Sequence, residues 1–142
     1  MDLPDVNILV HAFRPDSAGH ALCRAWLERV LESGDELAMS DVVLTGLVRV
    51  STHERIFRHP SKTGEALAFC AQLLAYRAIV PLRSGLRHWS IFSSLCRATR
   101  ARGNDVPDAW LAALAIEHGC RWITLDRGFS RFPDLLMAAP GT

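Results

Sequence analysis

The stretch Leu3-Pro4-Asp5-Val6-Asn7-Ile8-Leu9-Val10 decides the fold, because it joins a short apolar strand to a helix through one acidic residue. Pro4 suits the start of a strand, where its nitrogen does not have to donate to a neighbouring strand. The apolar residues after Asp5 continue to Phe13 and predict a short helix over residues 6–13. Asp5 is therefore expected where a strand ends and a helix begins.

Two later stretches place an acidic residue at the same kind of junction. Gly103-Asn104-Asp105-Val106-Pro107-Asp108-Ala109 opens a helix, and Arg121-Trp122-Ile123-Thr124-Leu125-Asp126 closes a strand. In an open α/β sheet, strand ends and helix starts meet at one edge, where ligands bind. Helix starts and turns also favour aspartate for local reasons. The joint placement nevertheless predicts that three carboxylates converge at one site, those of Asp5, Asp108 and Asp126.

Convergent carboxylates need a counter-charge, because like charges repel. At about 4 Å and an effective dielectric constant of about 20, each pair costs on the order of 4 kcal/mol. A hard divalent cation offsets this cost, since Mg²⁺ and Mn²⁺ prefer oxygen ligands. The three acidic residues therefore predict a site for such an ion.

The rest of the chain alternates apolar strands with amphipathic helices. Strands are expected over residues 3–5, 37–39, 78–82, 122–125 and 135–138, and helices over 6–13, 17–32, 41–52, 63–76, 85–101 and 108–118. Residues 127–133 are expected to form a loop, and Asp105 to cap the helix that follows it. Inward-facing residues are expected to include Ala21, Leu22, Ala25, Trp26, Val30 and Trp89. The alternation predicts an α/β fold with a parallel sheet of four to five short strands and helices on both faces.

Composition fits one folded domain over residues 1–142. The chain is 49% hydrophobic and 22% charged, as is usual for globular proteins. Its net charge of +1 does not by itself indicate a nucleic-acid-binding protein. Lys62 is the only lysine, and arginine suits phosphate contacts. A GC-rich coding sequence would give the same bias toward arginine.

Nothing in the sequence predicts export or membrane insertion. The four cysteines form no CxxC pair and are expected to be reduced and packed. The N-terminus lacks the basic and apolar regions of a signal peptide. The longest apolar-rich segment, residues 66–76, is too short to span a bilayer. We therefore expect a cytoplasmic protein that does not associate with a membrane.

In their order and spacing, these motifs resemble the PIN-domain ribonucleases, and specifically the VapC toxins of type II (VapBC) toxin–antitoxin systems. The resemblance covers nearly the whole chain. It rests on Asp5-Val6-Asn7-Ile8-Leu9, on Val48-Arg49-Val50-Ser51-Thr52-His53, on Pro107-Asp108-Ala109 with its apolar helix, and on Thr124-Leu125-Asp126-Arg127. It implies a PIN-like three-layer α/β/α sandwich.

The resemblance also implies a reaction, the divalent-metal-dependent endonucleolytic hydrolysis of RNA. Asp5, Asp108 and Asp126 would be the catalytic residues and the ligands of Mg²⁺ or Mn²⁺, which activates water. Three carboxylates favour one stable ion, with a second recruited by RNA phosphate. Supporting residues that orient the carboxylates, or serve only as ordinary cap, turn and strand residues, are Asn7, Asn104 and Thr124.

Two positions depart from the family pattern. Gly46 stands where many relatives have a glutamate, and Gly128 stands where many have a second acid after Asp126. Glycine also occupies the first position in a VapC-like subgroup, so that change is compatible with activity. Asp105 is an extra acidic residue that either compensates for the lost charge or only caps the helix.

Contacts with partners are less well defined by the sequence. Arginines in predicted loops are candidates for phosphate contacts or ordinary surface residues, namely Arg14, Arg55, Arg58, Arg127 and Arg131. The resemblance implies a homodimer and a cognate VapB-like antitoxin that neutralises the toxin. Candidates for the antitoxin groove, unless they belong to the core, are Phe13, Trp26, Val43 and Leu47.

Two other functions remain open on the sequence alone. A degenerate PIN domain would bind RNA or an antitoxin without catalysis, and Gly46 and Gly128 keep this alternative in view. A different Mg²⁺-dependent phosphohydrolase would use the same acidic residues on a related sheet. The sequence does not define which RNA is cut.

Overall fold

One five-stranded sheet organises the computed structural model, which describes residues 1–142. Its strands are β1 (Asp2–Pro4), β2 (Leu37–Ser40), β3 (Ile79–Leu82), β4 (Arg121–Ile123) and β5 (Met137–Ala138), in the order β3-β2-β1-β4-β5. All neighbouring strands are parallel, which confirms the expected sheet. The strand order reverses at β1, and ligands bind at such a point in open α/β sheets.

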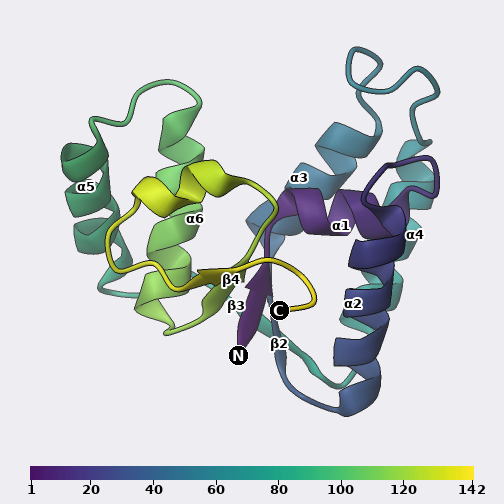
Figure 1. Cartoon of the computed structure of the whole chain (residues 1–142), viewed down its shortest axis with the longest axis horizontal. Coiled ribbons are helices and arrows are strands. Elements are labelled where there is room, and N and C mark those ends of the chain that lie inside the picture. The colour runs from purple at the N-terminus through teal and green to yellow at the C-terminus, as the bar shows by residue number, and fades with distance from the viewer.

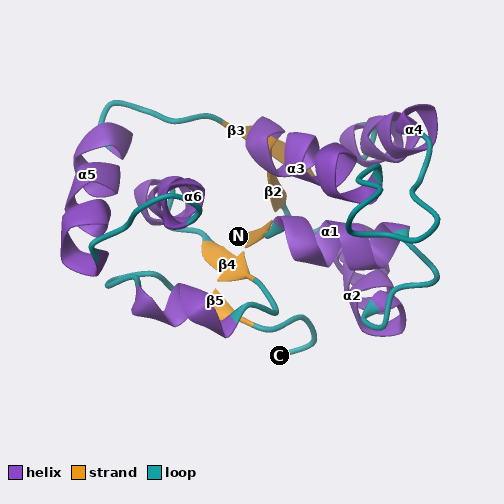
Figure 2. Ribbon diagram, turned by 90° about the horizontal axis from the view of Figure 1, so that it is seen from above, coloured by secondary structure: helices purple, strands orange, loops and turns teal.

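Helices cover both sides of the sheet, so the expected three layers are present (Figure 2). They are α1 (Val6–Phe13), α2 (His20–Ser33), α3 (Asp41–Ser51), α4 (Thr63–Leu74), α5 (His88–Thr99) and α6 (Asp105–Glu117). Helices α5 and α6 lie on one side, and α1 to α4 lie on the other (Figures 1 and 2). No helix has the length and apolar character needed to cross a membrane.

The core lies between these layers. β2 is buried along its whole length, and Trp122 and Ile123 of β4 are fully enclosed. On α6 the run from Leu111 to Ala115 is buried, since small alanines let the helix approach its neighbours closely. The central strands are therefore apolar on both faces, as parallel sheets require.

Two expectations about buried helix faces were wrong in part. On α2, Ala21, Leu22 and Ala25 are exposed, and the buried stripe is instead Cys23, Trp26 and Leu27 with half-buried Val30. Trp26 and Val30 face inward as expected, and the remainder of the buried stripe consists of Cys23 and Leu27 instead of Ala21, Leu22 and Ala25. On α5, Trp89 is 72% exposed, because the neighbouring His88 turns toward α6 and hydrogen-bonds to the carbonyl of Trp110 at 2.9 Å.

Some element boundaries also differ from expectation. Helix α6 begins at Asp105, and Asn104 is its N-cap, so Asp105 is not the cap. Helix α5 begins at His88 instead of Gly85, because the N–H groups of Gly85 and Arg87 donate to the Glu117 carboxylate. The expected loop over 127–133 contains a 3-10 helix, η1 (Arg127–Arg131).

Candidate active site

Asp5 lies directly after β1 and is the N-cap of α1. Its Oδ1 accepts a hydrogen bond from the N–H of Val6 at 2.6 Å. Its Oδ2 accepts from the hydroxyl of Thr124 at 2.6 Å and from the amide of Asn7 at 2.9 Å. The residue is only 6% exposed. Both carboxylate oxygens are thus held at the carboxyl edge of the sheet by partners from β1–α1 and from the chain after β4.

Thr124 and Asn7 tie the ends of β1 and β4 together. The Thr124 hydroxyl accepts from the Asn7 amide at 3.2 Å and from the N–H of Asp126 at 3.0 Å. The N–H of Leu125 donates to Asn7 Oδ1 at 3.4 Å. Each group therefore has a partner that fixes its orientation, which is the arrangement that an orienting residue needs.

Asp126 is held by the turn that begins η1. Its Oδ1 accepts from the N–H of Gly128 at 2.8 Å, and the side chain is exposed. Asp126 follows β4, the strand next to β1 in the sheet. Its carboxylate therefore stands at the same edge as that of Asp5.

Asp108 reaches this edge from the first turn of α6, where Asp105 also lies. Its Oδ2 accepts from the guanidinium of Arg131 at 3.1 Å. The same guanidinium lies 3.7 Å from Oδ1 of Asp105. Asn104 is exposed, and its side chain makes no hydrogen bond with any of these carboxylates. The structure thus brings Asp105 to the site through Arg131 but leaves the Asn104 side chain apart.

The carboxylates influence one another electrostatically. Burial raises the pKa of Asp5 from its ordinary 3.8 to about 6; hydrogen bonds from Thr124 and Val6 oppose the rise, and the charges of Asp108 and Asp126 add to it. Burial also raises the pKa of Asp108, while its contact with Arg131 acts in the opposite direction. Asp5, Asp108 and Asp126 therefore share one electrostatic field.

The donor set fits a hard divalent cation in type, since every candidate ligand is a carboxylate oxygen. However, no three His, Cys, Asp or Glu side chains stand close enough together to enclose an ion as they are. The Asp108 carboxylate is paired with Arg131, and Asp126 Oδ1 accepts from the N–H of Gly128. Binding an ion would therefore require the carboxylates to move.

Side chains lie close to both glycines that stand in place of acidic residues of the family pattern. A Cβ atom on Gly46 would lie 2.5 Å from Cγ2 of Val6, so α3 approaches α1 as closely as glycine permits. A Cβ atom on Gly128 would lie 2.9 Å from Oδ1 of Asp126 and 3.1 Å from Nη1 of Arg131. Neither position admits a larger residue without movement of these neighbours.

Arg14 is not available for phosphate contacts, so that expectation was wrong. It is 5% exposed and forms an ion pair with Asp16 at 2.7 Å. Its Nη atoms also donate to Ser61 Oγ and to the carbonyl of His59, each at 2.8 Å, and its guanidinium lies 3.8 Å from the centre of the Phe57 ring. Arg14 therefore fixes the segment between α3 and α4.

The expected groove residues belong largely to the core. Trp26, Val43 and Leu47 are buried and do not line an open surface. An open groove of about 420 Å³ lies instead between α2 and α4, with apolar walls formed by Leu27, Leu31, Phe69, Leu73 and Tyr76.

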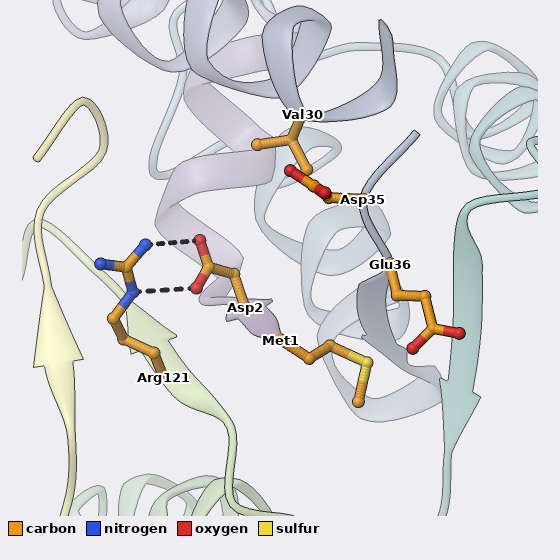
Figure 3. Close-up of a pocket in the computed structure, with 6 residues that line it drawn as sticks. All are labelled: Met1, Asp2, Val30, Asp35, Glu36 and Arg121. Atoms are coloured by element: carbon orange, nitrogen blue, oxygen red, sulfur yellow. Dashed lines mark hydrogen bonds and ion pairs between the residues drawn. The ribbon is translucent and has the colours of Figure 1, made fainter. Parts of the chain in front are cut away.

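A separate pocket of about 410 Å³ lies at the opposite edge of the sheet (Figure 3). Asp2 at the start of β1 pairs with Arg121 at the start of β4 through two hydrogen bonds of 2.9 Å. Asp35 and Glu36 also line it. Because the strands begin here and Asp5 lies where β1 ends, this pocket is not part of the acidic site.

Comparison with known proteins identifies the family. The model of the PIN domain matches residues 3–135. VapC ribonuclease Mb2897 of Mycobacterium bovis is 43% identical over 136 residues, which are 96% of this chain and 92% of that protein. Ribonuclease VapC31 of Mycobacterium tuberculosis is 36% identical over 140 residues, or 99% of each chain. The chain therefore belongs to the PIN-domain family, among the VapC ribonucleases.

Solved structures support the same fold. VapBC2 from Rickettsia felis, bound to a DNA fragment from its promoter, matches with a TM-score of 0.72 at 19% identity and covers 96% of each chain. VapC20 of Mycobacterium tuberculosis, a toxin that cleaves the sarcin-ricin loop, has a TM-score of 0.66 at 17% identity, over 96% of this chain and 99% of that one. At these identities the structural likeness concerns the fold alone.

Proposed function

We propose that the chain is a toxin endoribonuclease that hydrolyses RNA phosphodiester bonds with a divalent metal ion and is neutralised by a cognate VapB-like antitoxin. The observation that carries this proposal is Asp5, a buried carboxylate whose pKa is raised to about 6 beside Asp108 and Asp126. Burying a carboxylate costs folding free energy, and a buried carboxylate with a perturbed pKa is a candidate for a functional site that a cation or substrate completes. Membership of the VapC ribonucleases supports catalysis over binding alone.

Asp5, Asp108 and Asp126 would hold Mg²⁺ or Mn²⁺. When bound, the ion supplies an acidified water and offsets the charge of the scissile phosphate. The protein's part is to orient the carboxylates. The Thr124 hydroxyl and the Asn7 amide hold Asp5, and the N–H of Gly128 holds Asp126. Asp105 would act at the margin of the site through Arg131, and the Asn104 side chain lies apart from the carboxylates.

The groove between α2 and α4 suits an apolar segment of the antitoxin. Its walls carry leucine and aromatic side chains, and acidic and basic residues stand at its rim, namely Arg24, Glu28 and Glu32. One structure of similar fold is a toxin–antitoxin complex from Klebsiella pneumoniae. We further propose a homodimer of single-domain chains, spanning residues 1–142, that acts in the cytoplasm.

The test is cleavage of a broad pool of RNA by the purified protein in Mg²⁺, in Mn²⁺ and in chelator. Asp5→Asn removes the central carboxylate while keeping an oxygen that accepts from Val6. Asp35→Asn is the matched control, since Asp35 is exposed at the opposite edge of the sheet. Metal-dependent, discrete fragments from the wild type and from Asp35→Asn, but not from Asp5→Asn, are expected.

Each other outcome has a defined meaning. Binding of RNA or antitoxin without cleavage by well-folded protein would favour the degenerate binding domain. Turnover of small phosphate esters without RNA cleavage would favour another phosphohydrolase. Equal cleavage by wild type and Asp5→Asn would remove Asp5 from the catalytic site.

A further inference from the structure

Arg131 is the one loop arginine whose side chain contacts the acidic residues. Arg14 is buried and its donors are used elsewhere. Arg55 and Arg58 lie in the segment after α3, and their side chains contact none of the three carboxylates. The Arg127 side chain is exposed and makes no ion pair or hydrogen bond. Arg127 also lies at the carboxyl edge, beside Asp126, but Arg131 is the arginine whose guanidinium contacts the carboxylates there.

The position of Arg131 does not depend on the acidic residues. Its Nη1 donates to the carbonyl of Gly128 at 2.5 Å, within the same 3-10 helix. Its guanidinium lies 4.3 Å from the centre of the Phe132 ring and 5.9 Å from that of Phe129. A planar guanidinium stacks well on aromatic rings. These contacts would keep Arg131 at the edge even if Asp108 turned to another partner.

The ion pair with Asp108 does not explain Arg131 by itself. Arg131 and Asp108 are each about one third exposed, at 31% and 34%, and exposed pairs of this kind contribute about 0–1 kcal/mol. A guanidinium has five N–H donors, and here only Nη1 and Nη2 make hydrogen bonds, so several donors remain free. A fork of donors fits the oxygens of a phosphate.

We propose that Arg131 binds a phosphate of the RNA next to Asp5, Asp108 and Asp126 and positions it for cleavage. This inference rests on the proposed ribonuclease function and adds a residue to it. When RNA is bound, the guanidinium exchanges its contact with Asp108 for the phosphate, and the Asp108 carboxylate becomes available to a cation. Arg131 is therefore a substrate-positioning residue of the site.

Binding without cleavage gives the first test. The probe is a short fluorescein-labelled single-stranded RNA pool of random sequence, titrated in Mg²⁺ against Asp5→Asn and against Asp5→Asn with Arg131→Gln. Loss of one phosphate contact should lower the slope of log affinity against log salt by about 0.7. Affinity should fall roughly tenfold, the effect of one charge-assisted hydrogen bond. Arg29→Gln in the same background is the matched control and should change neither value, because Arg29 is exposed on α2 next to Val30, which lines the pocket at the opposite edge of the sheet.

Cleavage by proteins with an intact Asp5 gives the second test. Arg131→Lys keeps the charge but loses the fork, so it should keep the salt slope while its kcat falls. Arg131→Gln should both raise KM and lower kcat. An unchanged salt slope on replacing Arg131 by Gln, or an equal loss of RNA affinity in Arg29→Gln, would overturn the proposal. A third outcome would also overturn it, namely that Arg131→Gln needs less Mg²⁺ for cleavage than the wild type while its affinity for RNA stays the same. Arg131 would then compete with the metal ion for Asp108 and would not bind the phosphate. If the wild type neither binds nor cleaves RNA, the proposed function itself fails.

Discussion

Asp5→Asn is expected to stabilise the metal-free protein at neutral pH. Burial raises the pKa of Asp5 from 3.8 to about 6 in the folded protein, whereas the unfolded chain keeps an ordinary value. The folded state therefore holds the proton of the Asp5 carboxyl group more tightly than the unfolded chain does. As a result, the free energy of unfolding of the wild type falls as the pH rises from about 4 to about 6. A pKa shift of about two units corresponds to about 3 kcal/mol of free energy of unfolding, and this contribution is lost in full above this pH window.

Urea unfolding in chelator, from about pH 4 to about pH 7, measures this effect. The quantity to compare is the difference in free energy of unfolding between the wild type and Asp5→Asn at each pH. Other shifts, such as the raised pKa of Asp108 and the lowered pKa of Glu117, then largely cancel. Asp35→Asn should follow the wild-type curve. The difference should be smallest in acid and should grow in favour of Asp5→Asn toward neutral pH.

A pH-independent difference between wild type and Asp5→Asn would refute this reasoning, since it would mean that Asp5 titrates alike in the folded and unfolded states. Adding Mg²⁺ at neutral pH supplies a second check. A cation that binds the ionised carboxylate stabilises the folded wild type by mass action, and it should stabilise Asp5→Asn less. The difference in free energy of unfolding between Asp5→Asn and the wild type should therefore become smaller or change sign.

Four further outcomes follow from the same contacts. Thr124→Val removes the hydroxyl that lowers the pKa of Asp5, so the acid limb of the pH profile of kcat/KM should move to higher pH. Glu117→Gln weakens the acceptor for two backbone N–H groups and should cost about 1–2 kcal/mol in urea unfolding without loss of cleavage. Gly46→Ala should destabilise by about 1–3 kcal/mol through its clash with Val6, and Val6→Ala should restore part of this in a double-mutant cycle. Calorimetric titration of the RNA-free protein with Mn²⁺ should show one tight site, and two tight sites would contradict the single-ion hypothesis.

Local sequence signals were enough to predict the five strands and the layered fold. Each strand is a short apolar run between turn residues, so its identity is encoded within a few positions. Asp5 and Asp126 could be placed at one edge because parallel strands end on the same side of a sheet. Thr124 and Asn7 were recognisable for the same reason, since each lies within two residues of such an end.

Contacts between distant segments could not be predicted in this way. Arg14 lies in a polar turn, a setting typical of exposed residues, yet Ser61 and His59 from far along the chain satisfy its donors. The pairing of Arg131 with Asp108 joins η1 to α6 across 23 residues. Trp89 shares helical spacing with residues that do face inward, and only the packing of His88 on α6 decides which stripe is buried. Tertiary packing decided each of these cases over local preference.

The reduced number of acidic residues is compatible with a working site. A residue larger than glycine at position 46 would require Val6 to move, and one at position 128 would require Asp126 and Arg131 to move. Asp5, Asp108 and Asp126 carry three negative charges when ionised, and Asp105 adds a fourth near Arg131, so one divalent cation together with Arg131 would offset three of the four. A second cation would then need negative charge from elsewhere, which an RNA phosphate supplies. The arrangement therefore favours a site that is completed by its substrate over one that is preformed around two metal ions.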